Sequence, residues 1–381
     1  MDQIKQILNA VNLALFDRSV LPCSEEKDLS RLYSISKEQN ITGLVWQGLK
    51  SADKELKDTA GFVRHAAMCT YQYACQSAAL EHITHEMTQR GYAYILLKGS
   101  RMRQFYPEPH LRTSCDIDIL TVQKDDEIIE MMTSLGYQVS ADCGTTLNFS
   151  KPPAVEIEMH RRLFDEGLEY AAYFNHLWER SIPGADGTTE RLLTEEDFYA
   201  FMIAHAAKHF ARYGCGARPI IDIYLYLRKC PAEFDHAKAR KILKKLNLLP
   251  FEERICALAE AWFESGKLSK SDETLTKFIF NTGIFGDQSI TNAQRIRKNG
   301  SYKTGKRKLL FSHVFPSYRV MKPMYPRLLK CPVFLPIAWV LRWFRLLFRG
   351  RKQTASVLNS LNSMDDAYFG TLDEVMNELQ L

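Results

Sequence analysis

The segment LLKGSRMRQFYPEPHLRTSCDIDIL, residues 96–120, decides the fold of this chain. An apolar run ends at the Gly99-Ser100 pair and SRMRQFY can begin a helix, so the sequence predicts a strand, a turn and a helix. Backbone N–H groups at such a turn can bind phosphate, because the helix dipole also points at the ligand. CDIDILTV then predicts a second strand, on which Asp116 and Asp118 share one face. Neighbouring carboxylates repel each other unless a cation lies between them, and magnesium suits their oxygen atoms.

A third carboxylate is expected on the segment AVEIEMHRRLF, residues 154–164, because its side chains alternate strictly between apolar and polar. One face carries Val155, Ile157 and Met159, and the other carries Glu156, Glu158 and His160. Taken alone, this pattern is typical of a half-exposed edge strand. Because it follows the Asp-x-Asp strand, we instead expect Glu158 or Glu156 to complete a metal site.

Taken in order, the Gly-Ser turn, the helix and the Asp-x-Asp strand resemble the nucleotidyltransferase superfamily typified by DNA polymerase β. Fifteen residues separate Ser100 from Asp116, slightly more than is usual in that superfamily. The longer pattern is similar to an uncharacterised bacterial branch, the NTP_transf_5 family, whose marked positions are occupied here by Lys98, Gly99, Tyr106, Pro107, Arg112, Asp116 and Asp118. That branch carries an acidic residue two positions before a histidine, which points to Glu158 as the third carboxylate.

The resemblance implies magnesium-dependent transfer of a nucleoside monophosphate from a nucleoside triphosphate to an acceptor hydroxyl, with release of pyrophosphate. It implies two magnesium ions, with catalysis and metal binding by Asp116, Asp118 and Glu158. Lys98 and Arg112 would neutralise phosphate charge, while the backbone at Gly99 and Ser100 would hold the β- and γ-phosphates. We expect a small molecule, a sugar or a protein as acceptor rather than nucleic acid, because no RNA-binding motif is visible. The alternative is an inactive nucleotide-binding protein or a membrane-surface accessory protein.

The segment LTEEDFYAFMIAHAAKHFARYG, residues 193–214, predicts a helix that places His205 and His209 on one face. Its HAAKH sequence lacks the glutamate of the metalloprotease motif, so core or hydrogen-bonded histidines are favoured over a zinc site. The family branch has a similar helix followed by a Gly-Arg-Asp pattern, here Gly216, Arg218 and Asp222. The resemblance therefore places Lys208, His209 and Arg218 on a nucleotide-facing wall.

The length of 381 residues, with 46% hydrophobic and 11% aromatic residues, predicts a well-packed chain of several parts. We expect an α+β fold in which a small mixed-sheet core at 92–165 is flanked by an N-terminal helical region at 1–91, a helical domain at 166–290 and a basic helical arm at 291–381. Nine cysteines without a Cys-x-x-Cys pair, and a start unlike a signal peptide, predict reduced thiols in the cytoplasm. No apolar run is long enough to predict a membrane-spanning helix.

The charge of the chain is segregated. Sixteen Lys and Arg residues lie in 295–352, where Asp and Glu are absent, so the rest of the chain sums to −11 although the whole is +5. Within this arm, residues 332–352 predict a helix that combines an arginine stripe with aromatic faces. One interpretation is a peripheral membrane helix with Trp339, Trp343, Phe344 and Phe348 exposed. The other, which we prefer because exposed aromatics favour aggregation, packs these rings against the 170–290 region and pairs Arg342 and Arg345 with carboxylates. A nucleic-acid contact is a weaker third interpretation.

Overall fold

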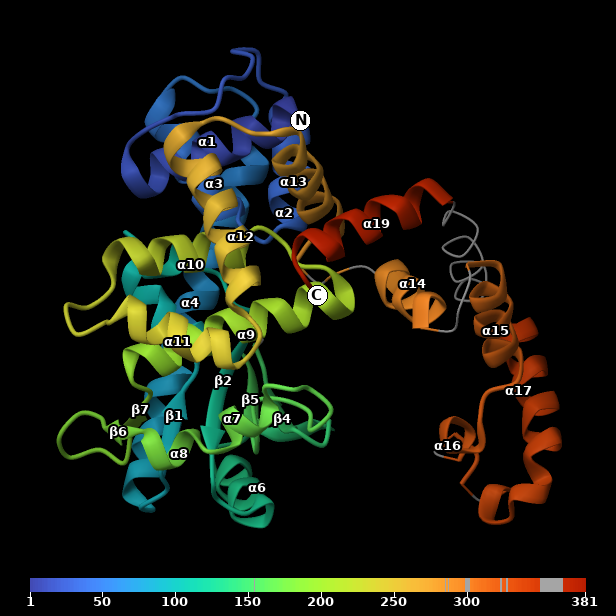
Figure 1. The fold of residues 1–381 in the computed structure, drawn as a ribbon. Coiled ribbons are helices and arrows are strands. Elements are labelled where there is room, and N and C mark those ends of the chain that lie inside the picture. The colour runs from blue at the N-terminus through green and yellow to red at the C-terminus, as the bar shows by residue number, and fades with distance from the viewer. Residues whose placement is uncertain are drawn as a thin grey trace. The chain divides into compact units, whose positions relative to one another are not determined.

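A computed structural model describes residues 1–153, 155–284, 286, 288–298, 302–322, 324–326, 328–349 and 366–381 (Figure 1). The chain forms two compact units. The first comprises Met1–Lys208, Cys215–Ile284 and Leu379–Leu381, and the second comprises His209–Gly214 and Phe285–Glu378.

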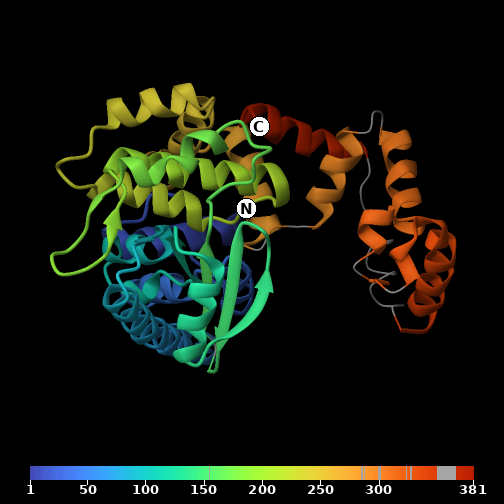
Figure 2. The same ribbon diagram turned by 90° about the horizontal axis from the view of Figure 1, so that it is seen from below.

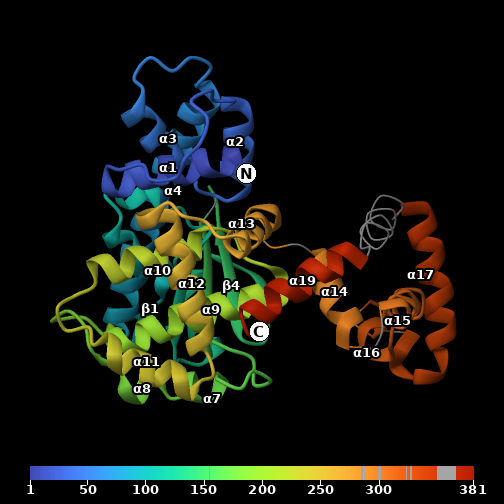
Figure 3. The same ribbon diagram turned by 45° about the horizontal axis from the view of Figure 1, so that its top comes forward.

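The first unit begins with helices, as the sequence predicts. The short helices α1, α2 and α3 cluster beside the long helix α4 (Figure 3). Beyond the end of α4, Gly91 has a φ of +72°, a left-handed conformation that glycine adopts without strain and that turns the chain toward the first strand. The four helices span Asp2–Phe16, Leu29–Glu38, Thr42–Ala52 and Ala60–Gln89.

A five-stranded mixed sheet follows, in the order β1-β2-β5-β4-β3. β2 and β5 pair in parallel, whereas the other neighbours are antiparallel. Between the Asp-x-Asp strand and the Glu158 strand, the chain forms an antiparallel pair of β3 and β4. The strands span Tyr94–Leu96, Asp116–Thr121, Gln138–Asp142, Thr146–Lys151 and Val155–His160. Between them lie α5 (Lys98–Met102), two 3-10 turns (Arg103–Phe105 and Pro109–Leu111) and α6 (Asp125–Ser134).

The two faces of the sheet differ in chemistry. Ile117 and Ile119 of β2, with Ile157 and Met159 of β5, are buried in one core with side chains of α4 and α6. Because successive strand residues point to opposite faces, the acidic residues of β2 and β5 lie together on the other face. The predicted α+β fold, a small mixed sheet flanked by helices, is confirmed.

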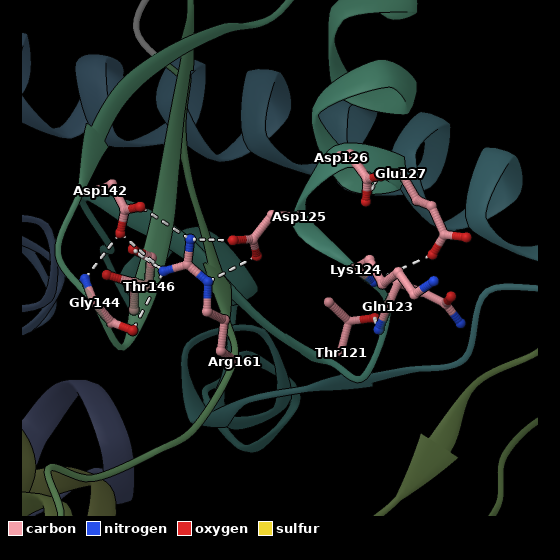
Figure 4. A network of polar contacts seen from close by, with 10 residues as sticks. All are labelled: Thr121, Gln123, Lys124, Asp125, Asp126, Glu127, Asp142, Gly144, Thr146 and Arg161. Atoms are coloured by element: carbon pink, nitrogen blue, oxygen red, sulfur yellow. Dashed lines mark hydrogen bonds and ion pairs between the residues drawn. The ribbon is translucent and has the colours of Figure 1, made fainter.

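Arg161, directly after β5, donates hydrogen bonds to the start of α6 and to the β3–β4 turn (Figure 4). Its Nε and Nη2 atoms donate to the Asp125 carboxylate at 2.8 and 2.9 Å, which holds the start of α6. Its Nη1 atom donates to Asp142 at 2.9 Å and to the carbonyls of Gly144 and Thr146 at 3.3 Å each, which holds the β3–β4 turn. This forked side chain therefore fixes the end of β5 relative to its neighbours.

The remainder of the first unit is mainly helical. The helix predicted within residues 193–214 is present as α9, and its start is capped because the Asp197 N–H donates to the Thr194 hydroxyl at 3.2 Å. Figure 2 shows α9 and α10 close together, in yellow-green, beside the green strands. The elements are α7 (Ala171–Asn175), α8 (Leu177–Arg180), β6 (Ile182–Pro183), β7 (Arg191–Leu192), α9 (Glu195–Tyr213), α10 (Arg218–Lys229), α11 (His236–Lys245), α12 (Leu249–Glu260) with a π-turn at Ala261–Ser265, and α13 (Lys270–Thr282).

The second unit contains the predicted arm helix as α17 (Leu335–Arg349). The expected pairing of Arg342 with a carboxylate is wrong, because its guanidinium donates to the His313 carbonyl at 2.8 Å. The Phe348 side chain and residues 350–352 lie outside the described part of the chain. No helix among the described residues has both the length and the apolar character to cross a bilayer. The other elements are α14 (Gln288–Lys298), α15 (Tyr302–Val314), α16 (Tyr318–Met321), 3-10 turns at Leu328–Lys330 and Pro332–Phe334, and α19 (Asp366–Glu378).

Candidate active site

The polar face of the sheet brings three potential metal ligands together. In the parallel register, Asp118 lies opposite Glu158, and His160 is two residues further along β5. Asp118 Oδ1 lies 2.9 Å from His160 Nε2, which in turn lies 3.7 Å from Glu158 Oε2. One ligand atom from each of these three residues falls within 4.8 Å of the others. Glu158 belongs to this group, whereas Glu156 is exposed.

Asp116 lies beside this group rather than within it. Its carboxylate accepts a hydrogen bond from the Ser114 hydroxyl at 3.2 Å. Sequence analysis placed His160 on the correct face through the strict alternation of its strand, but did not assign it a role. It also missed Asn148, whose amide donates to Glu158 at 3.0 Å from the neighbouring strand β4. No periodic signal in the sequence marks Asn148, because its partner is set by the register of β4.

The electrostatics of the group show a shortage of positive charge. Burial and the charge of Asp118 raise the pKa of Asp116, and burial together with Asp118 and Asp116 raises the pKa of Glu158. Burial also opposes ionisation of Asp118, but the hydrogen bond and charge of His160 outweigh it and lower the pKa of Asp118. Burial opposes the charged form of His160 too, yet its bond to Asp118 raises the pKa of the imidazole. The imidazolium thus supplies the one cation in direct contact with these carboxylates among the described residues.

The Gly-Ser turn lies directly against the carboxylates. A Cβ atom at Gly99 would lie 3.6 Å from Asp118 Oδ2 and 3.6 Å from Ser114 Oγ. The backbone N–H groups of Lys98, Gly99 and Ser100 have no acceptor within the described residues, as expected for the first turn of a helix. Burial lowers the pKa of Lys98 to about 8, although the charge of Asp222 opposes this. The turn therefore presents hydrogen-bond donors and a half-buried amine next to the acidic group.

Behind the turn, three residues that the family pattern marks form a buried network. Arg112 donates to Asp222 of α10 from Nε at 3.2 Å and from Nη2 at 2.9 Å, and its Nη1 donates to the Gly99 carbonyl at 3.0 Å. The Tyr106 hydroxyl donates to the same carboxylate at 2.9 Å. The Arg112 side chain is only 2% exposed, and its hydrogen bond holds the Gly99 carbonyl in position. The predicted neutralisation of phosphate charge by Arg112 stays a prediction.

The helical side of the site is less closely connected. Arg218 is half-buried and donates to the Thr113 carbonyl at 2.8 Å, just before β2. Lys208 Nζ lies 5.5 Å from the centre of the Phe164 ring, and its charge acts on His160. The His205 ring packs 5.7 Å from that of Phe201. The predicted nucleotide contacts of Lys208, His209 and Arg218 stay predictions.

Comparison with known protein families identifies the family of this chain. The model of a family described as "Uncharacterised nucleotidyltransferase" matches residues 25–264. The chain belongs to this uncharacterised nucleotidyltransferase family. The match includes the whole sheet, α5 and α10, so every member of the acidic group and of the buried network lies within the family region. No curated protein matches the chain significantly. The predicted resemblance is confirmed, and residues 265–381 lie outside the matched region.

Proposed function

We propose that this protein transfers a nucleoside monophosphate from a nucleoside triphosphate to an acceptor hydroxyl and releases pyrophosphate. The observation that carries the proposal is the close approach of the glycine turn of α5 to the acidic group on β2 and β5, since a Cβ atom at Gly99 would lie 3.6 Å from Asp118 Oδ2. A site that combines carboxylates with unsatisfied N–H groups can hold a divalent cation and a triphosphate side by side.

The residues fit a divalent cation. Asp116, Asp118 and Glu158 offer carboxylate oxygens on adjacent strands, and the raised pKa values of Asp116 and Glu158 reflect burial first and then repulsion from the Asp118 charge. We propose that these three side chains hold magnesium, with two ions as the family resemblance implies. Bound magnesium would supply positive charge to offset the charge that develops on the phosphates during transfer. His160 adds an imidazole nitrogen to the same group, a ligand that manganese accepts more readily than magnesium does.

The nucleotide would be held by α5 and its surroundings. The N–H groups of Lys98, Gly99 and Ser100 would bind phosphate oxygens, and the Lys98 ammonium would neutralise part of their charge. The network of Arg112, Asp222 and Tyr106 keeps the turn in place before nucleotide arrives. The acceptor hydroxyl then loses its proton to water as its oxygen forms a bond to the α-phosphorus. The bond from that phosphorus to the bridging oxygen breaks, and pyrophosphate leaves with this oxygen. Catalysis in this scheme comes from alignment and charge rather than from a covalent enzyme intermediate.

A labelling screen tests this function and identifies the acceptor, which we propose is a cytoplasmic small molecule, sugar or protein. Purified protein is incubated with cell extract, magnesium or manganese, and each nucleoside triphosphate labelled in either the α- or the γ-phosphate. We expect an extract component to gain the α-label alone, with pyrophosphate released. Transfer of the γ-label would contradict nucleotidyl transfer. Nucleotide binding without transfer or pyrophosphate release would instead favour the inactive nucleotide-binding protein.

A further inference from the structure

The second unit exposes a continuous apolar surface. Along α17, exposed apolar side chains recur at helical spacing, three and four residues apart, and the preceding turn extends them. Each member of this outer face is at least 43% exposed: Val333, Phe334, Ile337, Val340, Leu341 and Phe344. Most large apolar side chains of a folded helix are buried, so this surface requires a reason.

The opposite face of α17 explains why these side chains point outward. Trp339 and Trp343 donate their indole N–H groups to the carbonyls of Pro316 and Val314, at 2.8 Å each. Both rings pack edge-on against Phe315, at 5.1 and 5.3 Å between ring centres. With Ala338 buried against Met321, these contacts set the rotation of the helix. The outer face cannot turn inward without breaking these two hydrogen bonds and the ring contacts with Phe315.

The charge of this part of the chain identifies what the outer face meets. All sixteen Lys and Arg residues of 295–352 occur without a single Asp or Glu, and Arg319, Lys322, Lys330 and Arg345 are exposed in the second unit. A helix with exposed apolar side chains, in a segment rich in exposed cations and free of Asp and Glu, is the pattern of a helix lying in the interface of an anionic membrane. A second copy of the chain would bring two cationic surfaces together, and the aliphatic side chains that dominate the outer face offer no stacking surface to nucleic acid bases.

We propose that the outer face of α17 binds the surface of a membrane that contains anionic lipid. The apolar side chains enter the boundary between headgroups and acyl chains, while the basic residues contact lipid phosphates. This inference is independent of the nucleotidyltransferase chemistry.

The test is flotation of the full-length protein with vesicles made either of phosphatidylcholine alone or of an equal mixture of phosphatidylcholine and phosphatidylglycerol. We expect binding to the mixed vesicles only. Raising the salt from about 0.1 M to about 1 M should weaken binding, because the screening length falls from about 10 Å to about 3 Å. The double variant Ile337→Asp/Leu341→Asp should bind the mixed vesicles about tenfold more weakly or worse, since both side chains would enter the apolar layer as charges.

A control variant tests whether vesicle binding weakens after any loss of exposed apolar side chains or only after loss of those on α17. Val63→Asp/Met68→Asp changes two exposed apolar residues of α4, 50% and 60% exposed, and should leave vesicle binding unchanged. Circular dichroism and melting temperature should be the same for both variants and the parent. Equal vesicle binding by the Ile337/Leu341 variant and the parent would overturn the proposal, as would absence of parental binding. Lipid-independent dimerisation that the same variant abolishes would also overturn it, in favour of a second copy as the partner.

Discussion

At the scale of single residues, Asp116 and Asp118 have different surroundings although they share one strand face. Asp118 is paired with the His160 imidazole, whereas the Asp116 carboxylate accepts a hydrogen bond from the Ser114 hydroxyl and has no cationic partner in contact among the described residues. Asp118→Asn should therefore lower the melting temperature of the metal-free protein, while Asp116→Asn should raise it by removing a half-buried charge that the neighbouring Asp118 repels. Both should reduce metal-dependent pyrophosphate release about a hundredfold or more. Glu156→Gln, on an exposed residue of the same sheet, is the control and should change neither quantity. Full turnover in both Asp variants would remove these residues from the metal site.

Gly99 allows a graded test of the phosphate turn. Its added Cβ would make contacts of 3.6–3.9 Å, which are ordinary van der Waals distances, so Gly99→Ala should fold normally and lose little nucleotide affinity. Gly99→Val places two further methyl groups between the backbone and the phosphates, and affinity should fall about tenfold or more. Titration calorimetry with a nucleoside triphosphate measures both. If the valine variant bound like the parent, phosphate would have to lie elsewhere.

Lys98 gives the site a pH dependence. Because burial lowers its pKa to about 8, the amine loses its charge as pH rises through that value. Triphosphate affinity should therefore decline above about pH 8, and binding near this pH should take up a proton. In the unfolded chain Lys98 keeps its proton up to its ordinary pKa of 10.5, so this residue should make the unfolding free energy increase with pH between about 8 and 10.5. Lys98→Met should abolish both slopes, and an unchanged pH profile of binding in this variant would exclude Lys98 as the phosphate contact.

At the scale of elements, the buried ion pair connects α10 to the turn of α5. Asp222→Asn leaves Arg112 buried without its counter-charge and should lower the unfolding free energy by about 3–5 kcal/mol. The double variant Arg112→Met/Asp222→Leu should recover most of this loss, because two apolar side chains replace the pair. It should still bind nucleotide weakly, since the Gly99 carbonyl loses its donor. Denaturant unfolding and calorimetry separate the two effects. Recovery of both stability and affinity would show that the pair has no role in positioning the turn.

The hydrogen bonds of the Arg161 guanidinium also connect separate elements of the sheet region. Arg161→Ala should lower the melting temperature by about 2–4 °C, the shift that about 1 kcal/mol produces in a domain of similar size. Faster amide hydrogen exchange should be confined to the β3–β4 hairpin and the start of α6, which Arg161 connects (Figure 4). Arg161→Lys keeps the charge but not the fork, so it should behave almost like the alanine variant. Exchange that rises equally throughout the sheet would contradict a local role.

At the scale of the whole molecule, the features that could be predicted from the sequence are those that depend on the alternation of side chains along a strand and on the spacing of short motifs. The two-residue alternation of CDIDILTV and AVEIEMH placed Asp118, Glu158 and His160 on one face, and the Gly-Ser pair marked the turn of α5. It could not show that Arg112 and Asp222 meet, because that contact depends on how α10 packs behind the turn. Nor could it choose the partners of Arg342, since a backbone carbonyl carries no sequence signature. Local patterns were therefore predictable, and contacts that depend on tertiary packing were not.

The parallel pairing of β2 with β5 also has a consequence for folding order. The residues of α6, β3 and β4 lie between β2 and β5 in the chain and are synthesised before β5, so Asp118 and Glu158 become neighbours late. During synthesis, a nascent chain that has not yet produced β5 has no Glu158 or His160 to place beside its aspartates. The electrostatic repulsion between Glu158 and the two aspartates is thus postponed until β5 joins the sheet. Divalent ions should accordingly slow the departure of β5 from the native sheet far more than they speed the first steps of its assembly.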